Sequence, residues 1–292
     1  MLSTRAILLI LSAIASPSGA AFDAAPRRWT PPAISSDQYE SSPTFTPDGR
    51  EMYFMRADAS FGKYRLMSSR CEAGEWTTPA PPSFAAPSPV LEADPFVTAD
   101  GKRLYYVSSR HDASHQDLDI WFVERRPDGG WGEPQRLPEP VNSRSSELLP
   151  RVDREGRIYF GSSRPGGHGQ SDIYVATPTA GGTWDVKNMG LPVSTAANEY
   201  EAEISRDGRT LIVVADRGDR SHLYRYRRTD QGWVEQGRIP AAMNVFQVGP
   251  LLSPNADKLL FAQADGKLSG EMFVIDLAPH AGADWPPLCG GR

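Results

Sequence analysis

Four glutamates and one glutamine recur at equivalent positions along the 292-residue chain. Each opens a short phrase that reads Glu-x-x-Pro or a close variant, and we call this set the glutamate column: Glu40, Glu92, Glu147, Glu199 and Gln247. Carboxylates that converge on one point attract a cation, and a hard ion such as calcium prefers oxygen ligands. A bound calcium or other cation is therefore one interpretation of the column, and no other cofactor is indicated.

Arginines at a second repeated position favour a structural role for the same carboxylates. Arg110, Arg164 and Arg217 end the second strand expected in three of the copies. These arginines should lie on the same face as the glutamates and within reach of them. Buried pairs of carboxylate and guanidinium are strongly hydrogen-bonded. We therefore favour structural ion pairs over a cation site, and the identity of any metal stays unknown.

Histidines form a second candidate cluster, in the loops expected after the second strands. Four of the five histidines belong to it: His111, His115, His168 and His222. Loops on a rigid scaffold commonly carry recognition. His115, His168 and His222 are therefore candidate ligand-binding residues beside the glutamate column. A metal site at His111 and His115 is only weakly indicated, because their spacing suits a helix and this segment is a loop.

The elements that must position these side chains follow from the repeat itself. Copies start near residues 40, 92, 147, 199 and 247, a period of about fifty residues. Each copy continues through an Asp-Gly turn or its equivalent into an apolar run such as Arg103–Val107. A loop, a third apolar run such as Asp119–Val123 and a Gly-containing turn before a tryptophan complete the unit. Four short strands per repeat are typical of a propeller blade.

The sequence therefore predicts an all-β chain that forms a single β-propeller over residues 21–292. Five four-stranded blades are expected, with six as the alternative. Trp29-Thr-Pro-Pro32 matches the tail of a repeat, so the N-terminal segment is a candidate for the outer strand of the last blade. Trp285 and the two prolines after it compete for the same place.

The third copy resembles a known family of repeats. The phrase from Ser162 to Val175, which follows Glu147 and Gly156, is similar to the TolB-like, WD-repeat-like propeller repeats of bacterial envelope proteins. Trp131-Gly-Glu-Pro134 fits the linker between blades in that family. The resemblance implies a periplasmic scaffold or recognition domain. For such a module we expect an envelope protein, a peptide or a glycan as the partner. It does not by itself assign an activity.

The N-terminus and the composition restrict the setting. Residues 1–20 combine Arg5, an apolar run and small residues ending at Ala20, which is the pattern of a signal peptide cleaved near Ala20. We expect a periplasmic or secreted, monomeric protein without a transmembrane segment, because no later apolar run is long enough to cross a bilayer. The net charge of −5 and the lack of a basic run argue against nucleic acid as a partner.

The chain has two cysteines, Cys71 and Cys289, which lie in the first repeat and near the C-terminus. In an exported protein they are candidates for a disulfide that joins the first and last blades. Free thiols are the alternative.

Two functions from different classes remain open. The first is a recognition module that binds its ligand through the loops on the face where the glutamate column lies. The second is a glycoside hydrolase or lyase that uses glutamates at the mouth of the channel. Catalysis needs two carboxylates in unlike environments, whereas the column repeats one environment in every copy. The sequence therefore favours binding, and it assigns no catalytic residue.

Overall fold

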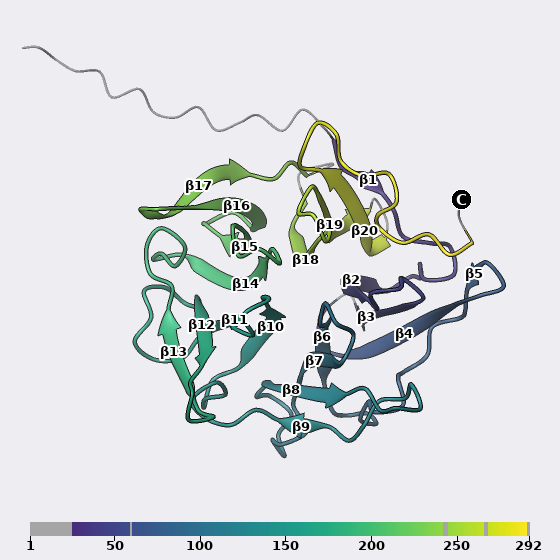
Figure 1. The fold of residues 1–292 in the computed structure, drawn as a ribbon, viewed down its shortest axis with the longest axis horizontal. Helices are drawn as coiled ribbons and strands as arrows, with labels where there is room; N and C mark the ends of the chain where they lie inside the picture. The colour runs from purple at the N-terminus through teal and green to yellow at the C-terminus, as the bar shows by residue number, and fades with distance from the viewer. Residues whose placement is uncertain (1–24, 59, 242–244, 266–267, 291–292) are drawn as a thin grey trace, which may run out of the picture.

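The computed structural model shows an all-β ring of five blades around a central axis (Figure 1). It describes residues 25–58, 60–241, 245–265 and 268–290, so the expected signal peptide lies outside the described residues. The innermost strands surround the axis: β2 (Tyr39–Phe45), β6 (Glu92–Val97), β10 (Glu147–Val152), β14 (Asn198–Ile204) and β18 (Gln247–Leu252). The predicted propeller is confirmed, with five blades rather than six.

Each blade runs outward from the axis through antiparallel neighbours. The second strands are β3 (Glu51–Ala57), β7 (Arg103–Ser108), β11 (Ile158–Ser162), β15 (Thr210–Asp216) and β19 (Lys258–Asp265). The third strands are β4 (Tyr64–Glu72), β8 (Asp119–Glu124), β12 (Asp172–Pro178), β16 (Ser221–Thr229) and β20 (Leu268–Asp276). The outer strands are β5 (Glu75–Trp76), β9 (Gln135–Arg136), β13 (Trp184–Asn188), β17 (Gly232–Arg238) and, in the fifth blade, β1 (Arg27–Arg28).

A tight turn joins the first and second strands of each blade. In blade 1 the hydroxyl of Thr46 donates to Asp48 at 2.6 Å and accepts the amide of Glu51 at 3.0 Å, while Gly49 takes a φ of 69°. Side chains that satisfy turn amides in this way make the turn locally encoded. We call the face with these turns the turn face. The opposite face, with the loops between second and third strands and the linkers between blades, is the loop face.

The ring is closed by the N-terminal segment. Strand β1 pairs antiparallel with β20, which places Arg27 opposite Val274 and Arg28 opposite Phe273. The amide of Met272 also donates to the Thr30 hydroxyl at 2.6 Å. Of the two segments that competed for this position, the N-terminal one therefore occupies it. Trp285 packs instead against the apolar cluster between blades 5 and 1.

Blade 5 also pairs directly with β2, the innermost strand of blade 1. Tyr39 of β2 pairs in parallel with Gly270 of β20. A Cβ on residue 270 would lie 2.2 Å from Cε1 of Tyr39, so only glycine allows the tyrosine ring to lie this close. The contact joins the strands of both blades into one continuous hydrogen-bonded sheet.

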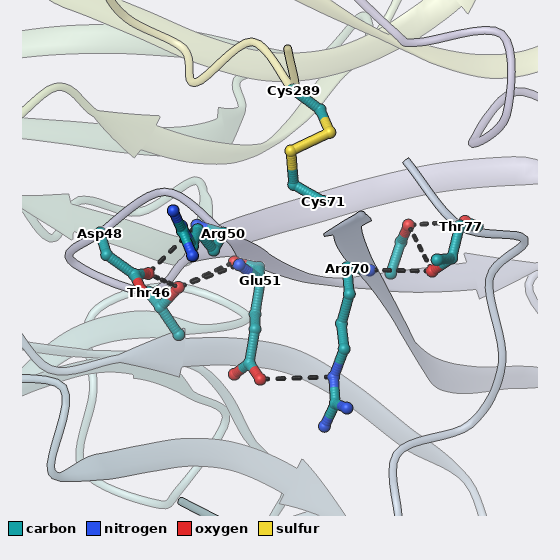
Figure 2. Close-up of a disulfide and its surroundings, with 9 residues drawn as sticks. Thr46, Asp48, Arg50, Glu51, Arg70, Cys71, Thr77 and Cys289 are labelled. Atoms are coloured by element: carbon teal, nitrogen blue, oxygen red, sulfur yellow. Dashed lines mark hydrogen bonds and ion pairs between the residues drawn. A yellow bond between two sulfur atoms is a disulfide. The ribbon is translucent and has the colours of Figure 1, made fainter. Parts of the chain in front are cut away.

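A disulfide adds a covalent link across the same junction. Cys71 of β4 and Cys289 near the C-terminus are bonded, at a sequence separation of 218 (Figure 2). The C-terminal segment reaches Cys71 by crossing over the turn at Gly49, where Pro287 lies against the glycine. Of the two states that the sequence left open for these cysteines, the structure has the bridge.

Apolar side chains fill the spaces between neighbouring blades. Trp131, at the end of blade 2, packs edge-on against Tyr53 of blade 1 and donates its ring N–H to the Tyr53 hydroxyl at 2.7 Å. Such a partner satisfies the one polar atom of a buried indole. Among the described residues, no helix has the length and apolarity needed to cross a membrane.

Candidate functional site

The glutamate column ties the linkers between blades to the inner strands. Glu147 accepts hydrogen bonds from the amide and hydroxyl of Ser143, from the hydroxyl of Ser162 at 3.0 Å and from Arg164 at 2.8 Å. Glu40 and Glu92 repeat the pattern, with Ser36 and the amide of Ala86 as their linker partners. All these partners belong to the same blade or to the linker before it. The carboxylates are therefore structural clips.

The arginine partners are only partly those expected. Arg110 pairs with Glu92 and Arg164 with Glu147, and Arg56, which the sequence analysis overlooked, pairs with Glu40 at 2.8 Å. Arg217 differs, because its guanidinium lies 3.0 Å from Glu235 and donates to the Tyr226 hydroxyl. The expected pairing of Arg217 with the column is thus wrong, since the outer strand β17 offers a nearer carboxylate.

The remaining two members of the column have no arginine partner among the described residues. Glu199 accepts from the amide and hydroxyl of Thr195, at 2.9 and 2.6 Å. Gln247 donates to the carbonyl of Pro240 at 3.0 Å and accepts from the amide of Leu223. All five members are completely or almost completely buried under the linkers. They do not form an open ring of ligands, so the calcium site considered from the sequence has no basis in the column.

One other cluster could hold a metal by its geometry. Among the His, Cys, Asp and Glu side chains of the described ranges, one group of three has its ligand atoms close enough together to share an ion: His111, Asp117 and Asp119. His111 Nε2 lies 2.9 Å from Asp119 Oδ2 and 3.5 Å from Asp117 Oδ2. The same oxygen of Asp119 also contacts the guanidinium of Arg136. A positive side chain already neutralises this carboxylate, so the cluster is a loop-fixing ion pair.

The three histidines predicted to bind ligand do not gather. His115 has a φ of 55° and its ring lies 3.5 Å from the Ser109 carbonyl, while the amide of His168 donates to Asp172 at 2.6 Å. His222 was expected in a loop but belongs to β16, where it is buried beside Asp219. None of these histidines, and no member of the glutamate column, lines the pocket on the axis.

The axial pocket combines an apolar, aromatic wall with two acidic side chains. It has a volume of about 370 Å³ and opens on the loop face. Every blade contributes to its lining, including the residue after each member of the glutamate column: Ser41, Ala93, Leu148, Tyr200 and Val248. Pockets of this size with an apolar wall and a few convergent polar groups are the usual form of a small-ligand site.

Aromatic rings form the wall of the pocket. Phe61 comes from the loop between β3 and β4, Tyr64 from the start of β4 and Phe246 from the linker into β18. Tyr39 lies behind them, with its ring 5.3 Å from Phe246 in a stacked arrangement and 4.6 Å from Phe61.

Two carboxyl groups, Asp94 and Glu201, also line the pocket and are almost completely buried, at 5% and 9% exposed. Asp94 accepts from the Ser42 hydroxyl at 2.7 Å and from the Leu149 amide at 3.1 Å, while Glu201 Oε2 accepts from the Gly249 amide at 2.7 Å. These contacts link adjacent blades around the axis.

The inner strands place these groups by a shared irregularity. The pairing of every first strand with its second strand shifts near the start. The third residue of each phrase lies at or beside this bulge, and four of the five have positive φ: Ser42, Asp94, Leu149, Glu201 and Gly249, of which Glu201 is the exception. A bulge redirects side chains relative to the regular pleat. Of these third residues, Asp94 and Glu201 line the axial pocket.

Burial dominates the electrostatics of the two acids. Burial, together with the nearby Asp94 carboxylate, raises the pKa of Glu201 to about 8. The pKa of Asp94 is also raised, chiefly by burial, although the Ser42 hydroxyl opposes the shift. At neutral pH the pair therefore retains a proton.

Below the two acids, an arginine closes the channel. Arg151 is completely buried, pairs with Glu203 at 2.6 Å and donates to the carbonyls of Pro150 and Pro250. Its guanidinium also lies over the ring of Phe96, 5.2 Å from the centroid. The side chain thus contacts four blades. It separates the axial pocket from a depression of about 390 Å³ on the turn face, which Glu203 lines.

Comparisons with known proteins support the fold. No family model and no curated protein matches the chain. A solved structure described as a putative TolB from Agrobacterium tumefaciens is 16% identical over 89% of this chain and 81% of that chain, with a TM-score of 0.54.

Two glycoside hydrolases are similar in the same way. A family 117 glycoside hydrolase from Zobellia galactanivorans is 12% identical over 90% of this chain and 93% of its own, with a TM-score of 0.57. An α-L-arabinofuranosidase from Lactobacillus brevis is 15% identical over 85% of this chain and 92% of its own, with a TM-score of 0.51. At these identities the similarity shows the fold alone. The fold and site define a five-bladed β-propeller with a pocket on its axis.

Sequence reasoning missed Asp94 and Glu201 because it searched for residues that repeat. A signal was nevertheless present, since the second and third positions of the phrase change from copy to copy and only the third includes acidic residues, Asp94 and Glu201. A residue that repeats has a structural role common to every blade. An unrepeated polar residue at an inner position has a role at one place in the ring.

Proposed function

We propose that this chain is an exported recognition module that binds a protein, peptide or glycan ligand at the axial pocket of its loop face. The observation that carries the proposal is the contrast between two sets of carboxyl groups. The repeated glutamates are enclosed by linker contacts. Asp94 and Glu201, which do not repeat, line an open pocket with aromatic walls.

Export is supported by two independent features. Residues 1–20 have the pattern of a signal peptide, and Cys71 and Cys289 form a disulfide. Structural disulfides persist in oxidising compartments such as the periplasm. The similarity to the TolB-like repeats agrees with a periplasmic location.

The proposal is tested by binding measurements on the chain from residue 21 onward. A glycan array and a displayed peptide library are screened, and the affinity for each hit is compared between the wild type and Phe246→Ala. Loss of a wall aromatic that stacks on the ligand should weaken binding about two- to tenfold, since such contacts contribute about 0.5–1.5 kcal/mol. Val234→Ala, which removes an exposed apolar side chain on the outer strand β17, is the control. Equal affinity in all three proteins would contradict a site at the axial pocket.

Glycoside hydrolysis is the second candidate, because Asp94 and Glu201 supply two carboxyl groups in one pocket. A hydrolase needs one ionised and one protonated carboxyl group in unlike environments. Here burial raises the pKa of both groups, and Asp94 is held by two hydrogen bonds. The two carboxyl groups thus lie in similar buried environments rather than unlike ones, which favours binding. Release of nitrophenol from a panel of aryl glycosides, with loss of that activity in Glu201→Gln, would establish the hydrolase instead.

A further inference from the structure

The axial pocket contains hydrogen-bond acceptors that the protein does not use. The amide of Gly249 occupies only Oε2 of Glu201, and no donor in the described part of the chain reaches Oε1. Ser41 also lines the pocket and is 1% exposed, yet its hydroxyl has no hydrogen-bond partner among the described residues. A buried hydroxyl without a partner, such as that of Ser41, is rare in folded proteins. These two oxygens are suited to a donor brought by a ligand.

The described lining of the axial pocket includes two acidic side chains and no basic one. No lysine, arginine or histidine is among the lining residues that the structure describes. The guanidinium of Arg151, the nearest cation on the axis, is bound to Glu203 and to two backbone carbonyls. A ligand that donates hydrogen bonds and carries positive charge is complementary to such a pocket.

The aromatic wall narrows the class of ligand further. Phe61, Tyr64 and Phe246 present rings around the opening, and the faces of such rings attract cations. A calcium ion needs six to eight oxygen ligands, which this wall does not supply. A guanidinium prefers both oxygens of a carboxylate, but one oxygen of Glu201 is already occupied by Gly249. An ammonium group, a compact charge with three donors, needs only one.

We propose that the axial pocket binds a primary ammonium group, with Oε1 of Glu201 and the Ser41 hydroxyl as acceptors and the rings of Phe61 and Phe246 around the alkyl chain. The inference rests on the proposed function and specifies its ligand. The ammonium group belongs either to a lysine side chain of a peptide or to a free small amine. Both share the chemistry that the pocket recognises.

Binding of a cation should release a proton. At neutral pH the acid pair holds a proton, because the pKa of Glu201 is raised to about 8. The other titratable groups that interact with Asp94 and Glu201 are Arg151 and three tyrosines, Tyr39, Tyr64 and Tyr200. The pKa of each of these tyrosines is raised above its ordinary value, so they stay neutral in this range. An ammonium group that displaces the proton therefore binds more tightly as the pH rises from about 6 to about 9.

The experiment is calorimetric titration of the chain from residue 21 onward with two pairs of probes. The first pair is n-pentylamine and n-pentanol, and the second is Nα-acetyl-lysine methylamide and Nα-acetyl-norleucine methylamide. Each cation should bind at least tenfold more tightly than its neutral counterpart, because a hydrogen bond to a charged group contributes about 1.5–3 kcal/mol. If only n-pentylamine binds, the source is a free amine, and if the lysine derivative also binds, a peptide side chain is accepted.

Variants locate the site. Glu201→Gln keeps an acceptor for the Gly249 amide but removes the charge, and should reduce the preference for the cation at least tenfold and abolish proton release. Ser41→Ala should weaken binding of the cation but not of the neutral probe. Glu75→Gln, at an exposed position of β5, should leave both affinities unchanged. Circular dichroism verifies that each variant is folded.

Two outcomes separate this inference from the proposed function. Equal affinity for cation and neutral probe, or an unchanged preference in Glu201→Gln, would overturn the ammonium site. The proposed function would survive if Phe246→Ala still weakened binding of a library hit. If, in addition, no library hit lost affinity in Phe246→Ala, both the ammonium site and the proposed function would be refuted.

Discussion

Asp94 and Glu201 illustrate how a protein holds acidic groups near its axis. Each is almost completely buried, and each is anchored to an adjacent blade through a backbone amide, from Leu149 and Gly249 respectively. Burying a carboxylate is unfavourable, so the group lowers its charge by keeping a proton. The same two groups are therefore a source of pH-dependent stability.

We expect the free energy of unfolding to fall as the pH rises from about 4.5 to about 8. The pKa of Glu201 is raised from 4.5 to about 8, so in this window the folded chain holds a proton that the unfolded chain has lost. The stabilisation is complete below the unfolded pKa and is lost as the pH passes the folded pKa. Urea unfolding at a series of pH values measures the slope, whose limit for one proton is about 1.4 kcal/mol per pH unit. Glu201→Gln should flatten the slope above pH 7, and a slope as steep as in the wild type would contradict this assignment.

The clip at Glu147 leads to a second expectation. Glu147→Gln removes the charge that Arg164 faces and disturbs the contact with Ser143. Loss of a charged hydrogen bond should lower the free energy of unfolding by about 1.5–3 kcal/mol. Glu155→Gln, at an exposed turn, is the matched control and should stay within about 0.5 kcal/mol of the wild type. An equal and small effect of both substitutions in thermal unfolding would show that Glu147 is not a clip.

At the scale of elements, the repeated bulge distinguishes the inner strands from ordinary strands. A regular strand alternates its side chains between two faces. The register shift near the start of each inner strand interrupts this alternation. Asp94 and Glu201 thereby reach the pocket while the glutamate before each of them stays under the linker. One irregularity, repeated in each blade, separates the structural carboxylates from those of the candidate site.

Strand β1 protects the edge of the fifth blade. A chain that begins at residue 31 lacks β1 and Thr30, so the third strand β20 loses its outer neighbour. We expect a lower melting temperature and concentration-dependent association, because an unpaired edge strand is a template for pairing with another chain. Calorimetry and light scattering measure the two effects against a chain that begins at residue 25. Identical melting of both chains would mean that β1 does not contribute to closure.

At the scale of the whole molecule, two devices close the ring at one junction. The non-covalent device is β1 on β20, and the covalent one is the disulfide between Cys71 and Cys289 (Figure 2). Both act where blade 5 meets blade 1, which is where a linear chain must become a closed ring.

Reduction of the disulfide should lower the melting temperature. The bridge spans 218 residues of sequence, and in the chain-entropy model a loop of that length stabilises the folded state by up to about 5 kcal/mol. Scanning calorimetry with and without reductant tests the effect. The double variant Cys71→Ser with Cys289→Ser should melt at the same temperature as the reduced wild type, and reductant should not change that temperature. Thiol titration that finds two free cysteines in the folded oxidised protein would refute the bridge.

The sequence by itself determined the blades. Turn residues such as Asp48 and Gly49 and alternating apolar runs act over a few residues, so the number of repeats and their four-stranded form can be read from local patterns. The partners of Glu92 and Glu147 could also be anticipated, because a clip within one blade repeats with the blade. Arg217 deviated because Glu235, on an outer strand of different length, is nearer to it.

Only the tertiary structure decided which residues meet on the axis. Asp94 and Glu201 are separated by two blade boundaries in the sequence. No local sequence pattern around either residue indicates that the other lies near it. They approach because closure of the ring brings five bulges to one place, and closure depends on contacts between the chain ends, β1 with β20 and Cys71 with Cys289. Long-range contacts of this kind leave no periodic trace in the sequence.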